Sequence, residues 1–182
     1  MKKYLIFTDL DGTLLDHENY SYGNNKKTIT SIINNENDVI FNTSKTFSES
    51  INLLKKLNLT NMPFSTENGA LLYFPKNRFK KIKNSSDYGK YWKIRIAKLS
   101  SKNWHQFLLK KQKKFKLLIA QDLPTKILKK YTNLDNTSKM LNREASQIIL
   151  WEDSLVNLKK FKNELRSEKQ GVLIQGSRFM QV

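Results

Sequence analysis

Cysteine is absent from the 182-residue sequence, so disulfide bonds and thiolate metal sites are excluded. Glycine and proline are scarce, with 6 and 3 residues, and the chain has no repeat, low-complexity tract or flexible linker. No apolar run is long enough to span a bilayer. The opening segment, MKKYLIFTDLDG, meets Asp9 and Asp11 after a few apolar residues and has no cleavage site, unlike a signal peptide. We therefore expect a cytoplasmic protein without a membrane partner.

Acidic residues are also few, because 16 Asp and Glu stand against 33 Lys and Arg, for a formal net charge of +17. Residues 76–116 hold fifteen basic residues and one acidic residue, so this range carries +14 of that total. Arginine contributes five residues and asparagine is abundant, a bias that an AT-rich coding sequence produces. We interpret the range as a solvated basic face. Nucleic-acid binding through it is the alternative.

The first half of the chain alternates between short apolar runs and amphipathic segments. Residues 4–8 and 39–41 are typical of buried parallel strands, and residues 25–36 and 47–57 are typical of helices. Residues 62–75 indicate a strand, a turn at Asn68–Gly69 and another strand. This β-α-β-α-β order predicts an α/β domain with a parallel sheet over residues 1–75.

A second module is expected from residue 76 to 182, because Pro75 and the lysines after it mark a change of composition. Aromatic residues interleave with lysines there, and their near-helical spacing predicts the apolar sides of two helices around 88–99 and 104–108. A base-stacking surface is the alternative. Helices near 124–131, before Arg143 and at 154–168 follow, with a strand at 147–151 and two short strands around Gly176. The predicted module is α+β.

The carboxyl ends of the first two strands carry the residues best suited to chemistry. Ligands of α/β sheets bind beyond these ends, where we expect Asp9 and Thr43. Asp9 can attack phosphorus and form an aspartyl-phosphate, while Asp11 serves as general acid and base. Two carboxylates this close repel each other unless a cation intervenes, so we expect Mg²⁺ at Asp9 and Asp11. Gly12 permits a tight turn, and Thr43, the amides after it and Lys45 can hold phosphoryl oxygens.

The segment DLDGTLL resembles the first motif of the haloacid dehalogenase superfamily of phosphotransferases. The chain is also similar to mannosyl-3-phosphoglycerate phosphatases in the order and spacing of five segments: FTDLDGTLLDHENYSY, VIFNTSKT, PFSTENGALLYFP, LNREASQIILWED and GSRFMQV. These Mg²⁺-dependent enzymes release phosphate from mannosyl- or glucosyl-3-phosphoglycerate in the synthesis of compatible solutes. The resemblance implies a Rossmannoid core with a parallel sheet and an α+β cap.

The resemblance also implies the roles of individual residues. Asp9 would be the nucleophile, Asp11 the acid and base, and Thr43 the phosphate ligand of the second motif. Together with the loops above, the substrate and phosphate side would comprise Gly12, Ser44, Lys45, Asn68, Gly69, Arg143, Ser146, Gly176, Ser177 and Arg178. A plain hairpin turn is the alternative for Asn68–Gly69, and a surface position is the alternative for the two arginines. A phosphoglycerate glycoside carries a phosphate and a carboxylate, which suits a basic cap.

Several family features are missing from the sequence. The chain has SQI after Glu144-Ala145, Ser177 before Arg178 and Gln181 near the end, where the family tends to have Ser-Glu-Pro, glycine and histidine. It also has no Gly-Asp-x-x-Asn-Asp-like loop and stops at Val182, in an expected cap strand. We therefore expect an incomplete sheet with an exposed edge and impaired activity. A truncation, a fragment or a split protein, completed by a second copy or a separate C-terminal segment, would each account for this.

Three hypotheses follow. The first is a phosphatase acting on mannosyl- or glucosyl-3-phosphoglycerate, or on another sugar phosphate, with reduced activity as this chain. The second is a non-catalytic protein that keeps the phosphate cradle and binds the same ligands. The third, ranked well behind, is a basic nucleic-acid-binding protein, whose affinity would fall steeply with salt.

Overall fold

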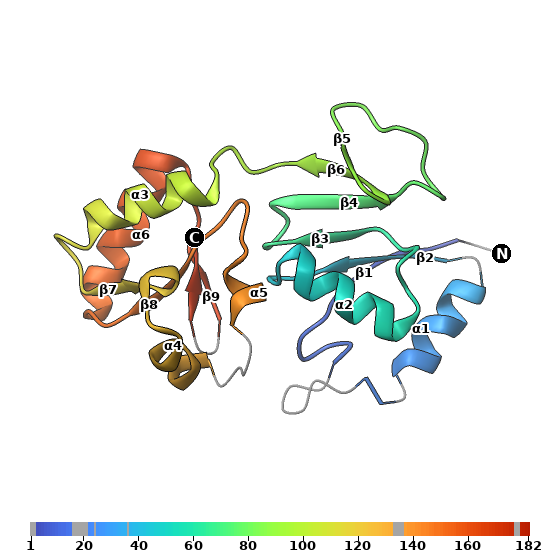
Figure 1. The fold of residues 1–182 in the computed structure, drawn as a ribbon, viewed down its shortest axis with the longest axis horizontal. Helices are drawn as coiled ribbons and strands as arrows, with labels where there is room; N and C mark the ends of the chain where they lie inside the picture. Colours follow the sequence, from blue (N-terminus) through green and yellow to red (C-terminus); the bar gives the residue numbers. More distant parts are fainter. Residues whose placement is uncertain (1–2, 16–21, 24, 36, 133–136, 177–178) are drawn as a thin grey trace. The chain divides into compact units, whose positions relative to one another are not determined.

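The computed structural model describes residues 3–15, 22–23, 25–35, 37–132, 137–176 and 179–182 (Figure 1). The chain divides into two compact units, Met1–Ala97 and Lys98–Val182, which we describe separately. The boundary lies later than the one expected after Pro75. The reason is that two further strands after Pro75 pair with the sheet of the first unit instead of joining the second. No helix in the described ranges is long and apolar enough to cross a membrane.

The first unit is built on a six-stranded sheet with the strand order β1-β2-β3-β4-β6-β5. Its elements are β1 (Leu5–Asp9), α1 (Asn25–Asn34), β2 (Asp38–Asn42), α2 (Phe47–Leu57), β3 (Phe64–Thr66), β4 (Leu71–Pro75), β5 (Ser86–Tyr88) and β6 (Tyr91–Arg95). Strands β1, β2 and β3 run parallel, whereas β3, β4, β6 and β5 pair antiparallel. The expected β-α-β-α-β order and the turn between β3 and β4 are confirmed.

Helix α2 is fixed at both ends by its own sequence. The side chain of Thr46 accepts a hydrogen bond from the Glu49 amide, and the Glu49 carboxylate accepts one from the Thr46 amide, at 2.9 Å, which makes a capping box. Asn58 ends the helix in the left-handed conformation at a φ of 60°. On the apolar side of α2, Leu54 and Leu57 are buried against the sheet. The start of α2, directly after the second strand and its loop, is therefore rigidly defined.

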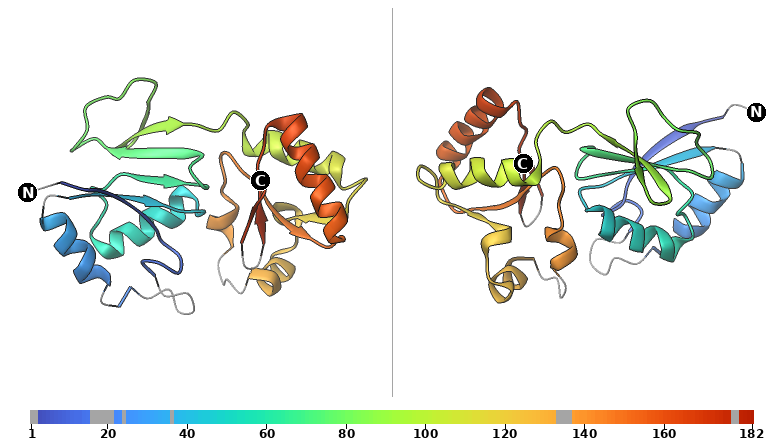
Figure 2. Two further views of the ribbon diagram at one scale, coloured as in Figure 1. Left: turned by 180° about the vertical axis from the view of Figure 1, so that it is seen from behind. Right: turned by 45° about the horizontal axis from the view of Figure 1, so that its top comes forward.

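Strand β1 differs from the expected strand buried on both faces, because Leu5 and Phe7 are 57% and 60% exposed. The order β1-β2-β3 with right-handed crossovers places α1 and α2 on the same face of the sheet (Figures 1 and 2). Val39 and Phe41 point to that face and are fully buried. Leu5 and Phe7 alternate onto the other face, and β1 is the edge strand among the described residues. The expected exposed edge is therefore found at β1.

The prediction of a helix around residues 88–99 is wrong. Tyr88, Tyr91 and Trp92 lie in β5 and β6, and β6 pairs with β4 from Leu71↔Arg95 to Pro75↔Tyr91. Antiparallel pairing with an existing strand outweighed the near-helical spacing of the rings. Gly89, at a φ of 61°, allows the tight turn between the two strands. The rings of Phe47, Phe64, Tyr73, Tyr88 and Tyr91 then form one aromatic cluster.

The second unit contains a four-stranded antiparallel sheet with the order β7-β8-β10-β9. Its elements are α3 (Ser101–Lys111), β7 (Leu117–Ile119), the 3₁₀ turn η1 (Ala120–Asp122), α4 (Thr125–Thr132), α5 (Ser138–Leu141), β8 (Ile148–Trp151), α6 (Leu155–Lys169), β9 (Ile174–Gln175) and β10 (Met180–Gln181). The helices and strands expected in this half, including the one around Trp104, are confirmed. The unit is α+β.

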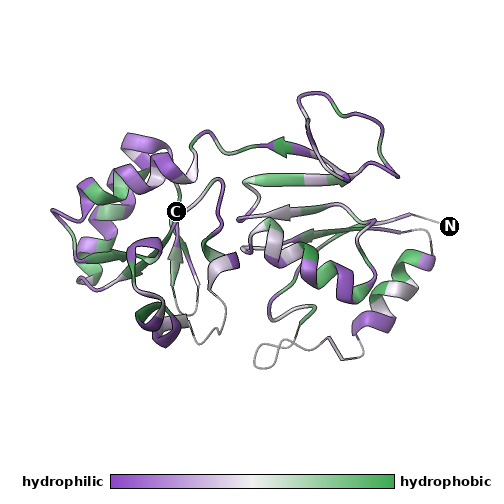
Figure 3. Cartoon of the chain, viewed as in Figure 1, coloured by the Kyte–Doolittle hydropathy of each residue, from purple (hydrophilic) through white to green (hydrophobic). Residues whose placement is uncertain are grey.

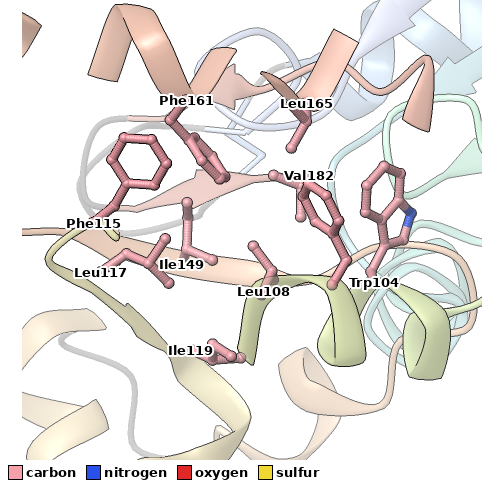
Figure 4. Close-up of a cluster of buried hydrophobic side chains, with 10 residues drawn as sticks. Trp104, Leu108, Phe115, Leu117, Ile119, Ile149, Phe161, Leu165 and Val182 are labelled. Carbon is pink, nitrogen blue, oxygen red and sulfur yellow. The ribbon is translucent and has the colours of Figure 1, made fainter. Parts of the chain in front are cut away.

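A hydrophobic cluster packs α3 and α6 of this second unit against its sheet (Figure 4). Helices α3 and α6 both carry hydrophilic and hydrophobic bands (Figure 3), and their apolar residues face the sheet. Phe161 and Leu165 of α6 and Leu108 of α3 are fully buried against Ile149 of β8. Phe161 lies with its ring centroid 5.3 Å from that of Trp151 and 5.5 Å from that of Phe115. This packing fixes α6 on the sheet.

An ion-pair network joins α3 to α6 at the edge of this cluster. Lys111 Nζ lies 2.7 Å from Glu164 Oε2 and 2.5 Å from Glu168 Oε1, and Lys114 also contacts Glu164. Hydrogen bonds from Lys111 and then Lys114 lower the pKa of Glu164 below its usual value. A lowered pKa stabilises the folded state above the ordinary carboxyl pKa, and this stabilisation is lost as pH falls through the folded-state value.

Glu164→Gln is expected to lower the free energy of unfolding by about 0.5–1 kcal/mol near neutral pH, because the pair is partly exposed to solvent. The difference from wild type should shrink as the pH falls below the ordinary carboxyl range. Urea unfolding across a pH series measures both the loss of unfolding free energy and its dependence on pH. Lys162→Gln, an exposed charge removed from the same helix, serves as the control. A Glu164→Gln effect that is the same at every pH would contradict the assignment.

Candidate functional site

The parallel pairing of β1 and β2 brings the first two sequence motifs to one edge of the sheet. Asp9, the last residue of β1, pairs with Asn42, the last residue of β2, and Thr43 follows directly. Both side chains therefore lie beyond the carboxyl ends of neighbouring parallel strands, where ligands of α/β sheets bind. Asp9 is exposed, and its Oδ1 accepts a hydrogen bond from the Leu10 amide at 2.7 Å. Thr43 is buried.

The loop after β1 is a tight turn anchored by leucines. Leu10, Leu14 and Leu15 are buried, at 0%, 3% and 2% exposure. Gly12, at a φ of 73°, donates its amide hydrogen bond to the Leu15 carbonyl, and the Leu15 amide donates to the Leu10 carbonyl. The buried leucines anchor the loop, so Asp9 before it and Asp11 within it extend from a fixed backbone.

The second carboxylate of the loop is paired with a lysine from the neighbouring loop. Lys45 Nζ lies 3.0 Å from Asp11 Oδ2, with the two side chains 20% and 30% exposed. The other oxygen, Oδ1 of Asp11, is buried without a hydrogen-bond partner among the described residues. A buried carboxylate oxygen in this state is suited to a further cationic or hydrogen-bond-donating ligand. Lys45 was expected to contact phosphate, and the structure adds its ion pair with Asp11.

The loop between β2 and α2 is held by local hydrogen bonds. The Lys45 amide donates to Thr43 Oγ1 at 3.2 Å, which leaves the Thr43 hydroxyl proton available for another acceptor. Ser44 lies between these two residues and is half-buried. The capping box of Thr46 and Glu49 fixes the next turn, so the loop leads into a helix N-terminus. This geometry suits the binding of phosphoryl oxygens.

The turn between β3 and β4 is bonded to this same loop. The Glu67 amide donates to the Lys45 carbonyl, and the Asn68 amide donates to the Thr43 carbonyl, each at 3.0 Å. Glu67, Asn68 and Gly69 have φ angles of 51°, 57° and 85°, so three consecutive residues adopt the left-handed conformation. The interpretation of Asn68–Gly69 as a hairpin turn is confirmed, and the turn also supports the Thr43 loop. The exposed Asn68 side chain lies next to that loop in the chain's fold.

The candidate residues of the second unit form a separate buried polar cluster. Arg143 is 9% exposed, so the alternative of a surface arginine is wrong. Arg143 Nη1 donates to Ser146 Oγ at 3.0 Å, and Gln181 Nε2 donates to the same oxygen at 3.1 Å. The buried Oε1 of Gln181 has no hydrogen-bond partner among the described residues. Gly176 donates its amide hydrogen bond to the Phe179 carbonyl, whereas Ser177 and Arg178 lie outside the described residues.

Two supporting features, the capping box of α2 and the contact of Glu67, were not identified in the sequence analysis. The capping box was visible as the pattern Thr46-Phe-Ser-Glu49, which is typical of a helix N-terminus. The role of Glu67, whose side chain is 3% exposed, had no local signal, because its amide meets Lys45 only through the pairing of distant strands. Sequence reasoning therefore named candidate residues of both loops and missed part of the hydrogen bonding that supports them.

The two carboxylates at the end of β1 and in the loop after it could hold a divalent cation. Asp9 and Asp11 offer carboxylate oxygens from one loop, and Oδ1 of Asp11 is buried and unsatisfied, which fits a hard cation. The described residues contain no cluster of three or more Asp, Glu, His or Cys side chains placed for a metal. Asp9 and Asp11 would thus hold such an ion together with water and substrate oxygens.

Comparison with known proteins assigns the family. The family model of haloacid dehalogenase-like hydrolases matches residues 6–180, so the chain belongs to this family. Over 142 residues it is 34% identical to a glucosyl-3-phosphoglycerate/mannosyl-3-phosphoglycerate phosphatase of Methanococcoides burtonii. That match covers 76% of this chain and 52% of the relative, so the chain spans about half the length of the protein it resembles.

Solved structures support the fold. A Thermoplasma acidophilum protein superposes with a TM-score of 0.63 at 16% identity, covering 100% of this chain and 64% of that one. A haloacid dehalogenase-like hydrolase from B. subtilis gives a TM-score of 0.62 at 11% identity, covering 97% of this chain and 72% of that one. The expected α/β fold of the haloacid dehalogenase type is confirmed.

Proposed function

We propose that this chain belongs to a phosphatase that hydrolyses a sugar-linked phosphoglycerate, with mannosyl- or glucosyl-3-phosphoglycerate as its substrate class. One observation carries the reaction type. The parallel register of β1 and β2 sets Asp9 beside the Thr43 loop, and the ion pair between Lys45 and Asp11 joins the two loops at 3.0 Å. A nucleophile, an acid and base, and a phosphate cradle therefore share one edge of the sheet.

The residues support a reaction in two steps. A carboxylate oxygen of Asp9 attacks phosphorus, the ester P–O bond breaks, and Asp11 gives its proton to the leaving oxygen of the substrate. Asp11 then takes a proton from water, whose oxygen attacks phosphorus and breaks the bond to Asp9. Inorganic phosphate leaves and both carboxylates return to their starting states.

The neighbouring loop stabilises the phosphoryl group in both steps. The hydroxyl of Thr43 can donate its proton to a phosphoryl oxygen while its oxygen accepts the hydrogen bond from the Lys45 amide. Lys45 orients Asp11 through the ion pair and can turn its ammonium towards phosphate when substrate arrives. Mg²⁺ held by Asp9 and Asp11 would neutralise the charge between the carboxylates and the phosphate.

The substrate class is supported by similarity and by charge. The relative from M. burtonii, 34% identical, is named as a phosphatase of glucosyl- and mannosyl-3-phosphoglycerate. A phosphoglycerate glycoside carries a carboxylate in addition to its phosphate. The basic chain, with a formal net charge of +17, suits a ligand that carries both anionic groups.

Phosphate release from both glycosides, with Mg²⁺ and with EDTA, tests the proposal. We expect release that depends on Mg²⁺ and that falls to background in EDTA, because the cation offsets the repulsion between the carboxylates and the phosphate as the bond between Asp9 and phosphorus forms. Glucose 6-phosphate, which lacks the glycerate carboxylate, serves as the control substrate. Equal rates on all three substrates would contradict the substrate class but leave the reaction type intact.

Calorimetric titration with the glycosides in EDTA separates turnover from binding. Binding without release in Mg²⁺ would favour the second hypothesis, a protein that keeps the phosphate cradle and not the reaction. Neither binding nor release, from a folded chain, would overturn the proposal. Activity that rises more steeply than the protein concentration would show that a second copy completes the site.

A further inference from the structure

A cavity of about 830 Å³ lies in the first unit, away from the candidate active site. Its wall is formed by one side of α2, by the end of β4 and by the turn between β5 and β6. The lining residues are Phe47, Ile51, Lys55, Thr60, Asn61, Pro75, Lys76, Asn77, Tyr88, Gly89, Lys90 and Tyr91. The volume falls within the range of about 300–1,000 Å³ that is typical of small-molecule sites. None of the lining residues belongs to the candidate active site.

The fold explains why this space exists. Strands β6 and β5 extend the sheet beyond the strands that α2 covers, so a corner remains between the helix and the outer hairpin. Pro75 pairs with Tyr91 at one end of β4, whereas Leu71, next to the turn that supports the Thr43 loop, lies at the other. At about 3.3 Å per residue these two ends of β4 are about 13 Å apart. A ligand centred near Pro75 would leave the phosphate loop open.

Aromatic rings form the apolar part of the cavity. The ring centroid of Phe47 lies 4.9 Å from that of Tyr88 and 5.9 Å from that of Tyr91, both nearly edge-on. Phe47 and Tyr88 are only half-buried, so part of each side chain remains accessible. The hydroxyl of Tyr91 donates to the Thr60 carbonyl at 2.8 Å, which fixes that ring in place. A planar ring can pack against this preformed surface.

The polar part of the cavity is positively charged. Lys55, Lys76 and Lys90 line it, together with the amide side chains of Asn61 and Asn77, and no lining residue is acidic. Lys76 is already paired with Asp87. Among the described residues Lys55 and Lys90 take part in no salt bridge, and both are exposed. Two ammonium groups therefore border the aromatic surface without a compensating charge.

We propose that this cavity binds a small molecule that joins a planar aromatic ring to a phosphate, of the nucleoside monophosphate class. The ring packs against Phe47 and Tyr88, and the phosphate meets Lys55 and Lys90. A purely apolar ligand leaves the two lysines unused, and inorganic phosphate leaves the rings unused. The inference is independent of the proposed function, because it involves neither Asp9 nor the Thr43 loop.

Calorimetric titration of the whole chain with AMP, in EDTA to prevent turnover, tests the proposal. We expect one AMP bound per chain, with adenosine and inorganic phosphate each at least about tenfold weaker. The double variant Lys55→Gln/Lys90→Gln should weaken AMP binding by at least about tenfold, and Tyr88→Leu should weaken it as well. The matched control is Lys110→Gln/Lys113→Gln, which removes two exposed charges from the second unit and should bind AMP like wild type.

Thr43→Val separates this cavity from the candidate active site. Undiminished AMP binding by Thr43→Val supports the proposal, and so does phosphate release by the Lys55→Gln/Lys90→Gln variant at the wild-type rate. Loss of AMP binding in Thr43→Val would place the nucleotide in the phosphate loop and overturn the proposal. Equal affinity for AMP and adenosine, equal affinity of the lysine variant and wild type, or no AMP binding at all would overturn it too.

Discussion

Asp9→Asn is expected to lower kcat for phosphate release by at least about 10³-fold, because the amide cannot form the aspartyl-phosphate. Asp9 lies at the carboxyl end of β1, beside the Thr43 loop, and it is exposed to an incoming phosphate. Removing its negative charge also removes a repulsion with the phosphate. The dissociation constant for substrate should therefore stay the same or fall while turnover is lost.

The measurement is a comparison of kcat with the substrate dissociation constant, the first from initial rates and the second from calorimetry in EDTA. Asp38→Asn makes the same chemical change at the opposite end of the paired strands, where Asp38 is bonded to Arg78. It should leave both values near wild type. If Asp9→Asn retains more than a tenth of the wild-type kcat, Asp9 is not the nucleophile.

Phe161→Ala should lower the free energy of unfolding of the second unit by about 3–5 kcal/mol, because it empties a large volume in a close-packed core. Phe161 is fully buried, and its ring packs on Phe115 and Trp151 between α6 and the sheet (Figure 4). Leu158 and Leu165 of α6, on either side of Phe161 in the sequence, are also buried and anchor the helix on the sheet.

Urea unfolding followed by tryptophan fluorescence measures this effect, because Trp104 and Trp151 both belong to the same cluster. Val156→Ala, on the exposed side of the same helix at 66% exposure, should cost less than about 0.5 kcal/mol. A Phe161→Ala loss below about 1 kcal/mol would mean that α6 is not packed on the sheet as described.

The two charge-related expectations had different outcomes. The aspartates at 9 and 11 were recognisable because their chemistry, the preceding apolar run and Gly12 lie within a few consecutive residues. The basic range 76–116 was divided by the fold between two units, with one part in the hairpin of the first sheet and another on α3. Two of its lysines, Lys76 and Lys90, border the aromatic cavity of the first unit.

The near-helical spacing of aromatic residues led to a wrong prediction where strand pairing determined the structure. Tyr88, Tyr91 and Trp92 recur at distances that a helix would also place on one side, yet β4 offers a complete set of backbone partners from Leu71 to Pro75. Hydrophobic periodicity indicates which residues are buried. It does not specify the backbone segment with which they pair. Around Trp104, in contrast, the helix is favoured locally, because the Ser100 side chain caps its N-terminus.

The sequence by itself determined the order of strands and helices in the parallel half of the first unit, the tight turn after Asp9 and the composition of the phosphate loop. These features depend on periodicity, capping and turn residues that lie close together in the chain. Only the tertiary structure decided the contact between Lys45 and Asp11, the support of the Thr43 loop by Glu67 and Asn68, the burial of Arg143 and the exposure of Leu5 and Phe7. Each of these features depends on strand pairing or helix packing between residues far apart in sequence. A local sequence pattern does not identify such a distant partner.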